Sequence, residues 1–391
     1  MMNSERLKRL PPYLFVEIDR LRESCIRSGK TVLDLGIGDP DIGAPAGLAL
    51  SLASGVGDHS YDRYPPGRGL PVLIEAIRAW AGERHGVDLE SEEVLITIGS
   101  KEAIGHLPLA VVDRGDVVFI PDPGYPVYLS SAVFAEAECV RFPLLEERRY
   151  WPDFSAFEVR SLERAKLIYL NYPNNPTAAT ADAGSFSEAV RFCAAHGITC
   201  ANDAAYCEIT FEDPAIPLFP IAREAAIPYI EFFSFSKTFC ITGWRIGFAV
   251  GSPDVISALA KIKDNIDSGV FGAIQRAIAD ALENSYDEYV SRTRSVFRQR
   301  RDILASHLER AGLSFTQPEA TFYFWIRTPG GMDSIAFCRL LIEELGIVAT
   351  PGVGFGPHGE GYFRLSLTTA TEVVEEAGRR LESVHDILNR T

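Results

Sequence analysis

Six short runs of apolar residues, separated by turn residues and helical patterns, constrain the fold of this chain most strongly. They cover residues 94–99, 117–121, 166–173, 198–206, 230–236 and 246–251. Most of the runs are apolar throughout instead of alternating with polar residues, as is typical of strands covered on both faces. Helical patterns lie between several of them, and one of these patterns ends at Gly197. This arrangement predicts an open α/β sheet whose strands are mostly parallel.

The C-terminal part of the chain has a different pattern and predicts a second, smaller domain. Residues 254–312 have the periodicity of long amphipathic helices, and the strand-like runs "TFYFWI" and "YFRLSL" follow with helices between them. At 391 residues the chain also exceeds the length that one hydrophobic core usually serves. We therefore predict a large α/β domain over residues 45–285 and a small α+β domain, with an N-terminal arm, over residues 1–44 and 286–391.

Charge, hydropathy and cysteine content exclude several functional classes. The net charge of −15 would repel a phosphate backbone and no basic tail offsets it, so we expect no nucleic-acid partner. No apolar run approaches the roughly 18 residues of a membrane span, and the N-terminus lacks a long apolar core, so we expect neither membrane insertion nor export. Seven cysteines without CxxC spacing argue against a disulfide framework and a zinc site. We expect a protein of the reducing cytoplasm that binds no metal.

Polar residues follow several of the apolar runs, at the point where ligands bind in open α/β sheets. Asn175 follows one run, Asp203 and Tyr206 close another, and Lys237 stands among apolar residues at the end of a third. This set suits an aldehyde on a pyridine ring. The acid keeps the ring nitrogen protonated, the phenol and amide hydrogen-bond the ring hydroxyl, and the lysine holds the aldehyde as an imine.

Each of these residues also has a purely structural interpretation. Asp203 is a common turn former, Asn175 suits an Asx-turn, and Tyr206 suits a core position. Taken together, these interpretations do not explain why all of the residues fall at strand ends. Their shared position favours a functional site.

The stretch "ITIGSKEAIGH" predicts a phosphate site where a strand passes into a helix. Gly99 permits close backbone approach, and the helix that starts near Ser100 and Lys101 presents unpaired N–H groups. The alternative is that Ser100 only caps the helix. No GxxxxGK[ST] motif occurs, so a P-loop nucleotide site is not supported.

The motifs "YPNNPT", "NDAAY", "SFSKTFCITGWRIG" and "GEGYFRLSL" occur in this order along nearly the whole chain. Together they resemble the class I and II aminotransferases of the pyridoxal-phosphate-dependent fold type I. The resemblance implies a large domain with a mostly parallel, seven-stranded sheet, beside a smaller α+β domain. It also implies pyridoxal 5'-phosphate as the cofactor and a ping-pong transamination.

The resemblance assigns the cofactor contacts residue by residue. Lys237 would form the internal aldimine, Asp203 would pair with the ring nitrogen, and Asn175 and Tyr206 would bind the ring hydroxyl. Tyr125 would stack on the ring, although a buried loop aromatic is the alternative. The phosphate would be held by Ser100, Lys101, Ser234, Ser236, Arg245 and, from the neighbouring subunit of a homodimer with shared sites, Tyr64. An apolar pocket and the cationic Arg245 should lower the pKa of Lys237, as a proton-transfer lysine requires.

The substrate end of the site is assigned in the same way. Arg364 would grip the α-carboxylate in a bidentate fork, and Gly38 would add a backbone N–H. The alternative for Arg364 is a surface salt bridge. The full set implied for the amino-acid and 2-oxo-acid substrates is Tyr13, Gly38, Tyr64, Lys101, Tyr125, Asn175 and Arg364.

The N-terminal "RLPPYLFVEIDRL" narrows the resemblance to the LL-diaminopimelate aminotransferases, in which Tyr13 belongs to the substrate site. The implied reaction transfers an amino group from LL-2,6-diaminopimelate to 2-oxoglutarate, in lysine biosynthesis. The alternatives are an aminotransferase for aspartate, glutamate or an aromatic donor, a carbon–sulfur β-lyase, and a non-catalytic regulator. Fold-related regulators carry an N-terminal DNA-binding domain, and only about 30 residues precede "VLDLGIGDP" here.

Two positions depart from the family pattern. Ala178 stands where the motif NPTG has glycine, so either the loop differs or alanine accepts a positive backbone angle. Gly67 and Arg68 stand in the loop where plant-type members have an acid that meets the far ammonium group of the substrate. An arginine there would prefer an acidic end group.

Overall fold

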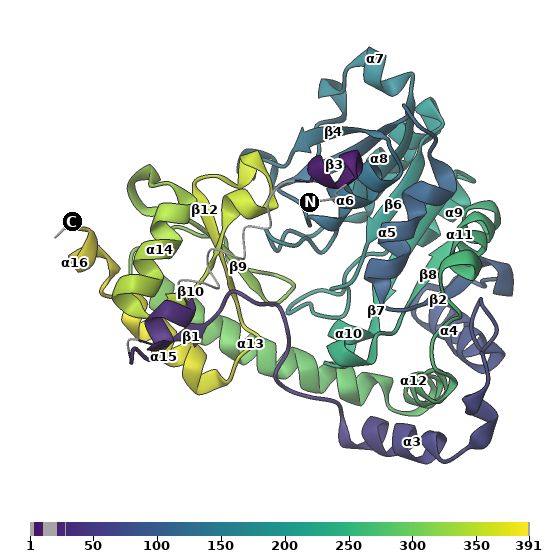
Figure 1. The fold of residues 1–391 in the computed structure, drawn as a ribbon, viewed down its shortest axis with the longest axis horizontal. Coiled ribbons are helices and arrows are strands. Elements are labelled where there is room, and N and C mark those ends of the chain that lie inside the picture. The colour runs from purple at the N-terminus through teal and green to yellow at the C-terminus, as the bar shows by residue number, and fades with distance from the viewer. Residues whose placement is uncertain (1–3, 11–21, 28, 390–391) are drawn as a thin grey trace.

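A seven-stranded sheet forms the centre of the computed structural model, which describes residues 4–10, 22–27 and 29–389 (Figure 1). The strand order is β2-β8-β7-β6-β5-β3-β4. β8 runs antiparallel to its neighbours β2 and β7, and every other pair is parallel. The predicted α/β class and the mostly parallel seven-stranded sheet are confirmed.

Strands and helices alternate along the first two thirds of the chain. The strands are β1 (Leu33–Asp34), β2 (Val94–Thr97), β3 (Val117–Asp122), β4 (Glu138–Pro143), β5 (Ala165–Leu170), β6 (Thr199–Asp203), β7 (Tyr229–Ser234), β8 (Gly247–Gly251), β9 (Tyr323–Arg327), β10 (Ile347–Val348), β11 (Thr350–Pro351) and β12 (Tyr362–Ser366). The helices are α1 (Glu5–Lys8), α3 (Ala46–Val56), α4 (Pro71–His85), α5 (Ser100–Val111), α6 (Val127–Phe134), α7 (Val159–Leu162), α8 (Ala183–His196), α9 (Phe219–Glu224), α10 (Phe235–Thr238), α11 (Pro253–Ile266), α12 (Gly272–Asn284), α13 (Tyr286–Arg310), α14 (Ser334–Leu345), α15 (Thr371–Leu381) and α16 (Val384–Leu388).

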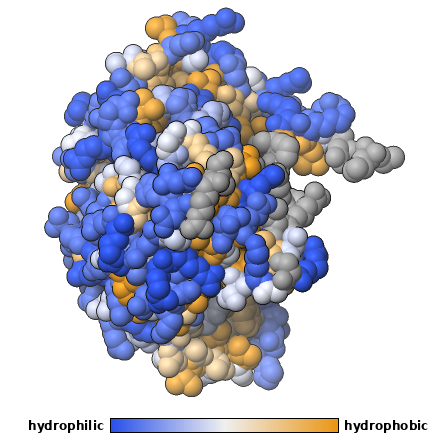
Figure 2. All heavy atoms as spheres, turned by 90° about the vertical axis from the view of Figure 1, so that its left-hand side faces the viewer, coloured by the Kyte–Doolittle hydropathy of each residue, from blue (hydrophilic) through white to orange (hydrophobic). Residues whose placement is uncertain are grey.

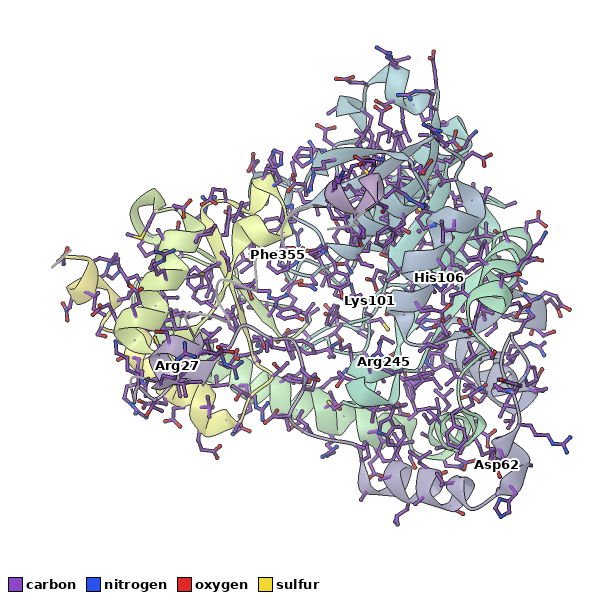
Figure 3. All side chains as sticks on the ribbon, in the orientation of Figure 1. Arg27, Asp62, Lys101, His106, Arg245 and Phe355 are labelled. Atoms are coloured by element: carbon purple, nitrogen blue, oxygen red, sulfur yellow. The ribbon has the colours of Figure 1, made fainter. Side chains whose placement is uncertain are left out.

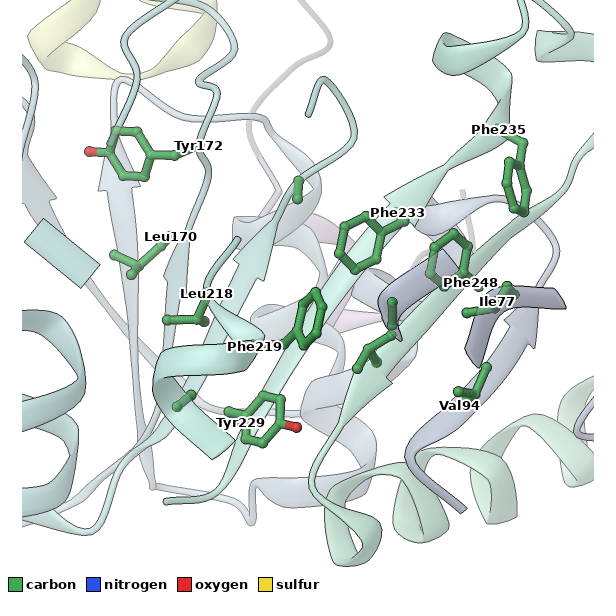
Figure 4. Close-up of a cluster of buried hydrophobic side chains, with 14 of the residues drawn as sticks. Ile77, Val94, Leu170, Tyr172, Leu218, Phe219, Tyr229, Phe233, Phe235 and Phe248 are labelled. Atoms are coloured by element: carbon green, nitrogen blue, oxygen red, sulfur yellow. The ribbon is translucent and has the colours of Figure 1, made fainter. Parts of the chain in front are cut away.

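Helices cover both faces of the large sheet, which explains why its strands are apolar throughout. On β5, Leu167 and Tyr169 pack with α5, α6 and α11, whereas Ile168 and Leu170 pack with α4, α8, α9 and α12. Figure 4 shows part of the second of these clusters, in which phenylalanine rings of β7 and β8 stack. Burial on both faces fixes the sheet and therefore the loops at its ends.

A smaller region is built around the antiparallel sheet β11-β12-β9 and the parallel pair β1-β10. Its own core draws side chains from these strands and from α13, α14 and α15, including Phe297, Phe337 and Leu365. The loop after β1 therefore enters the centre of the molecule from this smaller region. The limits predicted for the two domains, 45–285 and 1–44 with 286–391, stay a prediction.

All six apolar runs form strands, but the sequence did not predict β4. This strand lies at the edge of the sheet, next to β3 only, and most of its side chains are at least partly exposed. Glu138 and Arg141 interrupt its apolar pattern. An edge strand needs no continuous apolar run, because one side and part of its surface face solvent.

The loop after β5 settles the question raised by Ala178. This residue has φ of +61°, in the left-handed region that favours glycine. Its N–H donates to the carbonyl of Asn174 at 3.0 Å. The loop thus keeps the conformation that a glycine would take, at a steric cost of about 1 kcal/mol for the alanine.

Two further observations concern the chain outside the site. Across the described ranges, every helix is too short or too polar to span a bilayer. In the same ranges, no disulfide bond joins the cysteines.

Candidate active site

Five polar or charged side chains predicted from the sequence meet at the carboxyl edge of the large sheet. Asp203 is the last residue of β6, Lys237 lies in α10 directly after β7, and Asn175 lies in the loop after β5. Arg245 precedes β8, and because β8 is antiparallel its start lies at the same edge. Arg364 reaches this edge from β12 of the smaller sheet and donates to Asn175.

Lys237 is a partly buried amine near the centre of the site. Its Nζ donates to the carbonyl oxygen of Gly38 at 2.8 Å. Burial lowers the pKa of Lys237 to about 8, and the nearby Arg245 adds to this shift, whereas Asp39 opposes it. About a tenth of the amine is therefore unprotonated at pH 7, far more than for an ordinary lysine, and the unprotonated form is the one that nucleophilic attack and proton abstraction require.

Asp203 is buried, and neighbouring donors hold it in one orientation. The Tyr128 hydroxyl donates to Oδ2 at 2.8 Å, and the Ala205 N–H donates to Oδ1 at 3.3 Å. The second bond shows that Asp203 also shapes the local turn, as its structural interpretation proposed. Burial raises the pKa of Asp203 to about 6, against the opposing effects of Tyr128, Ala205 and Lys237. A cation placed beside this carboxylate would stabilise its charged form.

Arg364 is a buried guanidinium with 5% of its surface exposed. Nη1 donates to Asn175 Oδ1 and Nη2 to the Gly36 carbonyl, each at 2.8 Å, and Nε has no partner among the described residues. No acidic side chain in those ranges pairs with it, so the surface salt bridge considered from the sequence is wrong. A buried cation that lacks a counter-ion is costly unless a ligand supplies the negative charge. The geometry suits a carboxylate.

Tyr206 belongs to the same site, and its hydrogen-bond partner was not predicted from the sequence. Its hydroxyl lies 3.2 Å from the hydroxyl of Tyr323, the first residue of β9. Burial raises the pKa of Tyr206 well above its ordinary value, so the phenol stays protonated and can donate. The ring also packs in the core of the smaller region, as its structural interpretation proposed.

The start of α5 and the segment after β7 form a cradle of polar atoms. Ser100 is the first residue of α5, and the residue that caps the helix is Gly99, with no side-chain cap, so the N-cap interpretation of Ser100 is wrong. A Cβ on Gly99 would stand 2.7 Å from Nη2 of Arg245, which has no acidic partner in the described part of the chain. Ser234 and Ser236 are buried, and the hydroxyl of Ser236 has no partner there.

Lys101 and Tyr125 flank this cradle. The Nζ of Lys101 lies 5.8 Å from the centre of the Tyr125 ring, and that ring meets the ring of Tyr128 edge to face. In Figure 3, Lys101 and Arg245 lie near one another, between the start of α5 and α10. Unpaired N–H groups, hydroxyls and two cations together favour a dianion such as phosphate.

Buried charges hold the first turn of α5 in place. The Lys263 ammonium donates to Glu102 at 3.1 Å and to Asp267 at 2.8 Å, and Glu102 also accepts the Ile98 N–H at 2.8 Å. The lysine is almost fully buried, so its charge depends on these two acids. This network ties α5 to α11 and keeps the helix start beside Arg245.

Two of the residues considered from the sequence, Tyr64 and Arg68, lie outside the cluster, and a third is not among those that the structure describes. Tyr13 falls outside the described residues, and Tyr64 has 86% of its surface exposed. Arg68 donates from Nη2 to the Glu92 carbonyl at 2.9 Å. Glu92 precedes β2, so this guanidinium points toward the end of the strand opposite to Gly99. That orientation places the Arg68 guanidinium away from the candidate site of its own chain.

Three residues that hold the site together were missed from the sequence. Tyr128 positions Asp203, Tyr323 contacts Tyr206, and Asn171 donates to the Asp203 carbonyl at 2.7 Å. Tyr128 and Asn171 stand close to predicted residues along the chain, so local spacing was the available signal. Tyr323 lies more than 100 positions from Tyr206, and no local pattern joins them.

Comparisons with known proteins agree with this geometry. The family model "Aminotransferase class I and II" matches residues 30–381. An LL-diaminopimelate aminotransferase of Natranaerobius thermophilus is 41% identical over 385 residues, which are 97% of this chain and 99% of that protein. One of Aquifex aeolicus is 43% identical over 385 residues, or 97% of this chain and 98% of its own. The substrate-bound BacF structure from Bacillus subtilis superposes with a TM-score of 0.92, at 32% identity and 98% coverage of both chains.

The raised pKa of Asp203 predicts a pH-dependent stability in the protein without ligand. The folded pKa of about 6 exceeds the unfolded value, so the stabilising contribution is complete below about pH 4 and is lost as the pH rises through 6. Relative to Asp203→Asn, the wild-type free energy of unfolding should fall by about 2 kcal/mol between pH 4 and 7. Urea unfolding at several pH values measures this. Replacing the exposed Asp213 by Asn should leave the profile parallel to wild type; parallel profiles for Asp203→Asn would contradict the assignment.

Proposed function

The chain belongs to the class I and II aminotransferases, and on that premise we propose that it uses pyridoxal 5'-phosphate to transfer an amino group from LL-2,6-diaminopimelate to 2-oxoglutarate. The products are glutamate and the keto acid that cyclises to tetrahydrodipicolinate. One observation carries the proposal. Lys237, an amine with a pKa of about 8, shares a single site with the buried acid Asp203 and the buried guanidinium of Arg364, which has no acidic partner in the described ranges.

The polar atoms of the site fit the cofactor. Ser236 Oγ is buried and has no partner among the residues that the structure describes, and α5 starts without a side-chain cap, so both offer donors to a phosphate. The amide oxygen of Asn175 accepts a hydrogen bond from Arg364. The amide N–H₂ of Asn175 is therefore left to donate to a ring hydroxyl, together with Tyr206. The phosphate contacts proposed are Ser100, Lys101, Ser234, Ser236 and Arg245. Tyr125 is proposed to stack on the ring.

When bound, pyridoxal phosphate supplies an aldehyde that takes up the amino group and a protonated ring that accepts the electron pair released from the Cα–H bond. Lys237 supplies the amine that holds this aldehyde and then carries the proton to and from the substrate Cα. A pKa of about 8 suits both tasks at physiological pH. Asp203 keeps the ring nitrogen protonated, because a carboxylate and a protonated ring nitrogen side by side stabilise each other's charged forms.

Arg364 aligns the substrate. Its Nε, which has no partner among the described residues, and the remaining N–H groups of its Nη atoms would offer a planar fork to the α-carboxylate. Asn175 and the Gly36 carbonyl hold the other side of the guanidinium, so the fork cannot rotate freely. A proposed hydrogen bond from the Gly38 N–H completes the grip. Fixing the carboxylate plane also fixes the direction of the Cα–H bond relative to Lys237.

The first prediction tests the cofactor and the lysine together. Lys237→Ala should lose the visible absorption of pyridoxal phosphate bound to a lysine, and turnover should fall by about a thousandfold or more, because no other described amine lies at this point. Absorption spectra and steady-state assays measure both. Lys261→Ala, an exposed lysine on α11, is the matched control and should match wild type. Near wild-type turnover in Lys237→Ala would refute the proposal.

The second prediction concerns the donor. The relatives at 41% and 43% identity that are named for LL-diaminopimelate support this donor, as does the N-terminal motif with Tyr13. We expect kcat/KM for LL-2,6-diaminopimelate to exceed that for aspartate, glutamate, lysine and aromatic amino acids by about tenfold or more, since the far end of diaminopimelate carries both an ammonium and a carboxylate, and the far end of each other donor carries at most one of these groups.

The same panel separates the alternatives. An equal or better rate with another donor would reject diaminopimelate and keep the aminotransferase. Pyruvate released from cystathionine at a comparable rate would favour the carbon–sulfur β-lyase.

We further propose a homodimer whose subunits share active sites. Tyr64 is highly exposed, and other apolar side chains are exposed near it: Leu50 and Val56 on α3, Ile266 and Phe271. Figure 2 shows hydrophobic residues gathered at the lower end of the molecule, at the height of α3. In a dimer Tyr64 would reach the phosphate of the partner's cofactor.

Mixing experiments test this assembly. Lys237→Ala and Tyr64→Ala subunits, each impaired alone, should regain activity when refolded together, because one site of the mixed dimer then has both native residues. Absence of recovery, with a fully active monomer in sedimentation, would rule out shared sites.

We also propose that the protein works in a reducing cytoplasm. The proposed biosynthetic reaction and the free cysteines of the described ranges support this location.

A further inference from the structure

Tyr323 touches three parts of the candidate site from one position on β9. Its ring lies 4.0 Å from Cζ of Arg364, and its hydroxyl lies 3.2 Å from that of Tyr206. The same hydroxyl would stand 1.9 Å from a Cβ on Gly38, so it fills the space that glycine leaves open. The side chain is almost fully buried. None of these contacts follows from the packing of the smaller sheet alone.

We propose that Tyr323 is a positioning residue that joins the carboxylate-binding half of the site to the half that binds the cofactor ring. The ring of Tyr323 packs against the Arg364 guanidinium and fixes its orientation, and its hydroxyl sets the direction in which Tyr206 donates. The proposal rests on the function proposed above for Tyr206 and Arg364.

The first part of the argument concerns charge. Arg364 is buried and has no acid beside it in the described ranges, yet it must stay charged and ordered before a carboxylate arrives. The Tyr323 ring at 4.0 Å and the Phe355 ring at 4.8 Å each place an aromatic ring close to the guanidinium. A cation over an aromatic ring is attracted to the electron-rich face of the ring, and more strongly when both groups are desolvated. The nearer ring therefore partly replaces the missing counter-ion.

The second part concerns hydrogen-bond direction. A tyrosine hydroxyl has one hydrogen to donate. If Tyr206 donates to the cofactor ring hydroxyl, it cannot also donate to Tyr323, so Tyr323 must be the donor in the bond between them. Accepting this hydrogen bond polarises the Tyr206 hydroxyl and makes it a stronger donor. Tyr323 thereby strengthens the hydrogen bond to the hydroxyl oxygen of the cofactor ring without contacting that oxygen itself.

The third part concerns the loop after β1. The Tyr323 hydroxyl occupies the space beside Gly38, and the Gly38 carbonyl accepts a hydrogen bond from the Lys237 amine. The loop is also held by Ser366, which donates to the Ile37 carbonyl at 2.7 Å. Tyr323 therefore lies against the backbone that orients Lys237 and requires glycine at position 38.

Two variants separate the roles of ring and hydroxyl. Tyr323→Phe keeps the ring, so the dissociation constant for glutarate, an unreactive dicarboxylate, should stay within about twofold of wild type. Tyr323→Leu removes the ring, and this constant should rise about tenfold. Calorimetric titration of the protein without cofactor measures it. Tyr362→Phe is the control, because Tyr362 lies on the same face of the same sheet and its hydroxyl bonds Glu146 instead.

A second readout reports on the hydroxyl. A hydrogen bond donated to the ring oxygen stabilises its negative charge and so the deprotonated form of the chromophore. Weakening Tyr206 as a donor should therefore raise the pH midpoint of the visible absorption change of the cofactor-loaded protein. We expect a rise of about half a pH unit to one unit in Tyr323→Phe and in Tyr323→Leu, and none in Tyr362→Phe.

The outcomes are distinguishable. Unchanged glutarate binding in Tyr323→Leu together with an unchanged midpoint in Tyr323→Phe, in variants whose thermal unfolding matches wild type, overturns the inference. If the wild type gives no visible absorption with pyridoxal phosphate, the proposed function fails. The weaker glutarate binding of Tyr323→Leu would then still support the role of the ring at Arg364.

Discussion

The direction of the strands is the constraint on which the rest of this structure depends. Parallel strands bring their carboxyl ends to one edge, and the loops that follow β5, β6 and β7 therefore deliver Asn175, Asp203 and Lys237 to the same place. In the large sheet, β8 is antiparallel to its neighbours and begins at this edge instead of ending there. Arg245, which precedes β8, therefore lies at the same edge. A sheet covered on both faces keeps these loops fixed, because its strands cannot slide without exposing apolar side chains.

The charges of the site are held in states that a ligand would complete. Burial lowers the pKa of Lys237 and raises that of Asp203, so each group is pushed toward its neutral form. Arg364 stays cationic, without an acidic partner in the described ranges and against an aromatic ring. In a low-dielectric pocket an arriving anion or cation gains more from such groups than it would in water. The site is thus prepared for charged ligands before they bind.

Polar contacts between the two sheets set the distance across the site. Arg364 donates to Asn175, and the Phe355 carbonyl accepts the Gly124 N–H at 2.8 Å. These bonds join β12 and the loop before it to loops of the large sheet. Because they lie around the pocket, the grip on a carboxylate and the position of the lysine are set by one connected framework.

Patterns in the sequence predicted the sheet and much of the site. Continuous apolar runs require burial on both faces, which only a helix-covered sheet provides, and polar residues at strand ends then had to meet at one edge. The motifs around Lys237, Asp203 and Arg364 added the family resemblance. The edge strand β4 escaped detection because it needs no continuous apolar pattern.

The tertiary structure alone decided which groups touch. Tyr323 and Tyr206 are far apart along the chain, so no local spacing reveals their contact. The turn of Arg68 toward Glu92 and the left-handed backbone at Ala178 likewise depend on neighbours brought in by the fold. The order of residue types determines which positions along a strand or helix are buried. Distances across the site depend instead on how segments far apart in the sequence pack together.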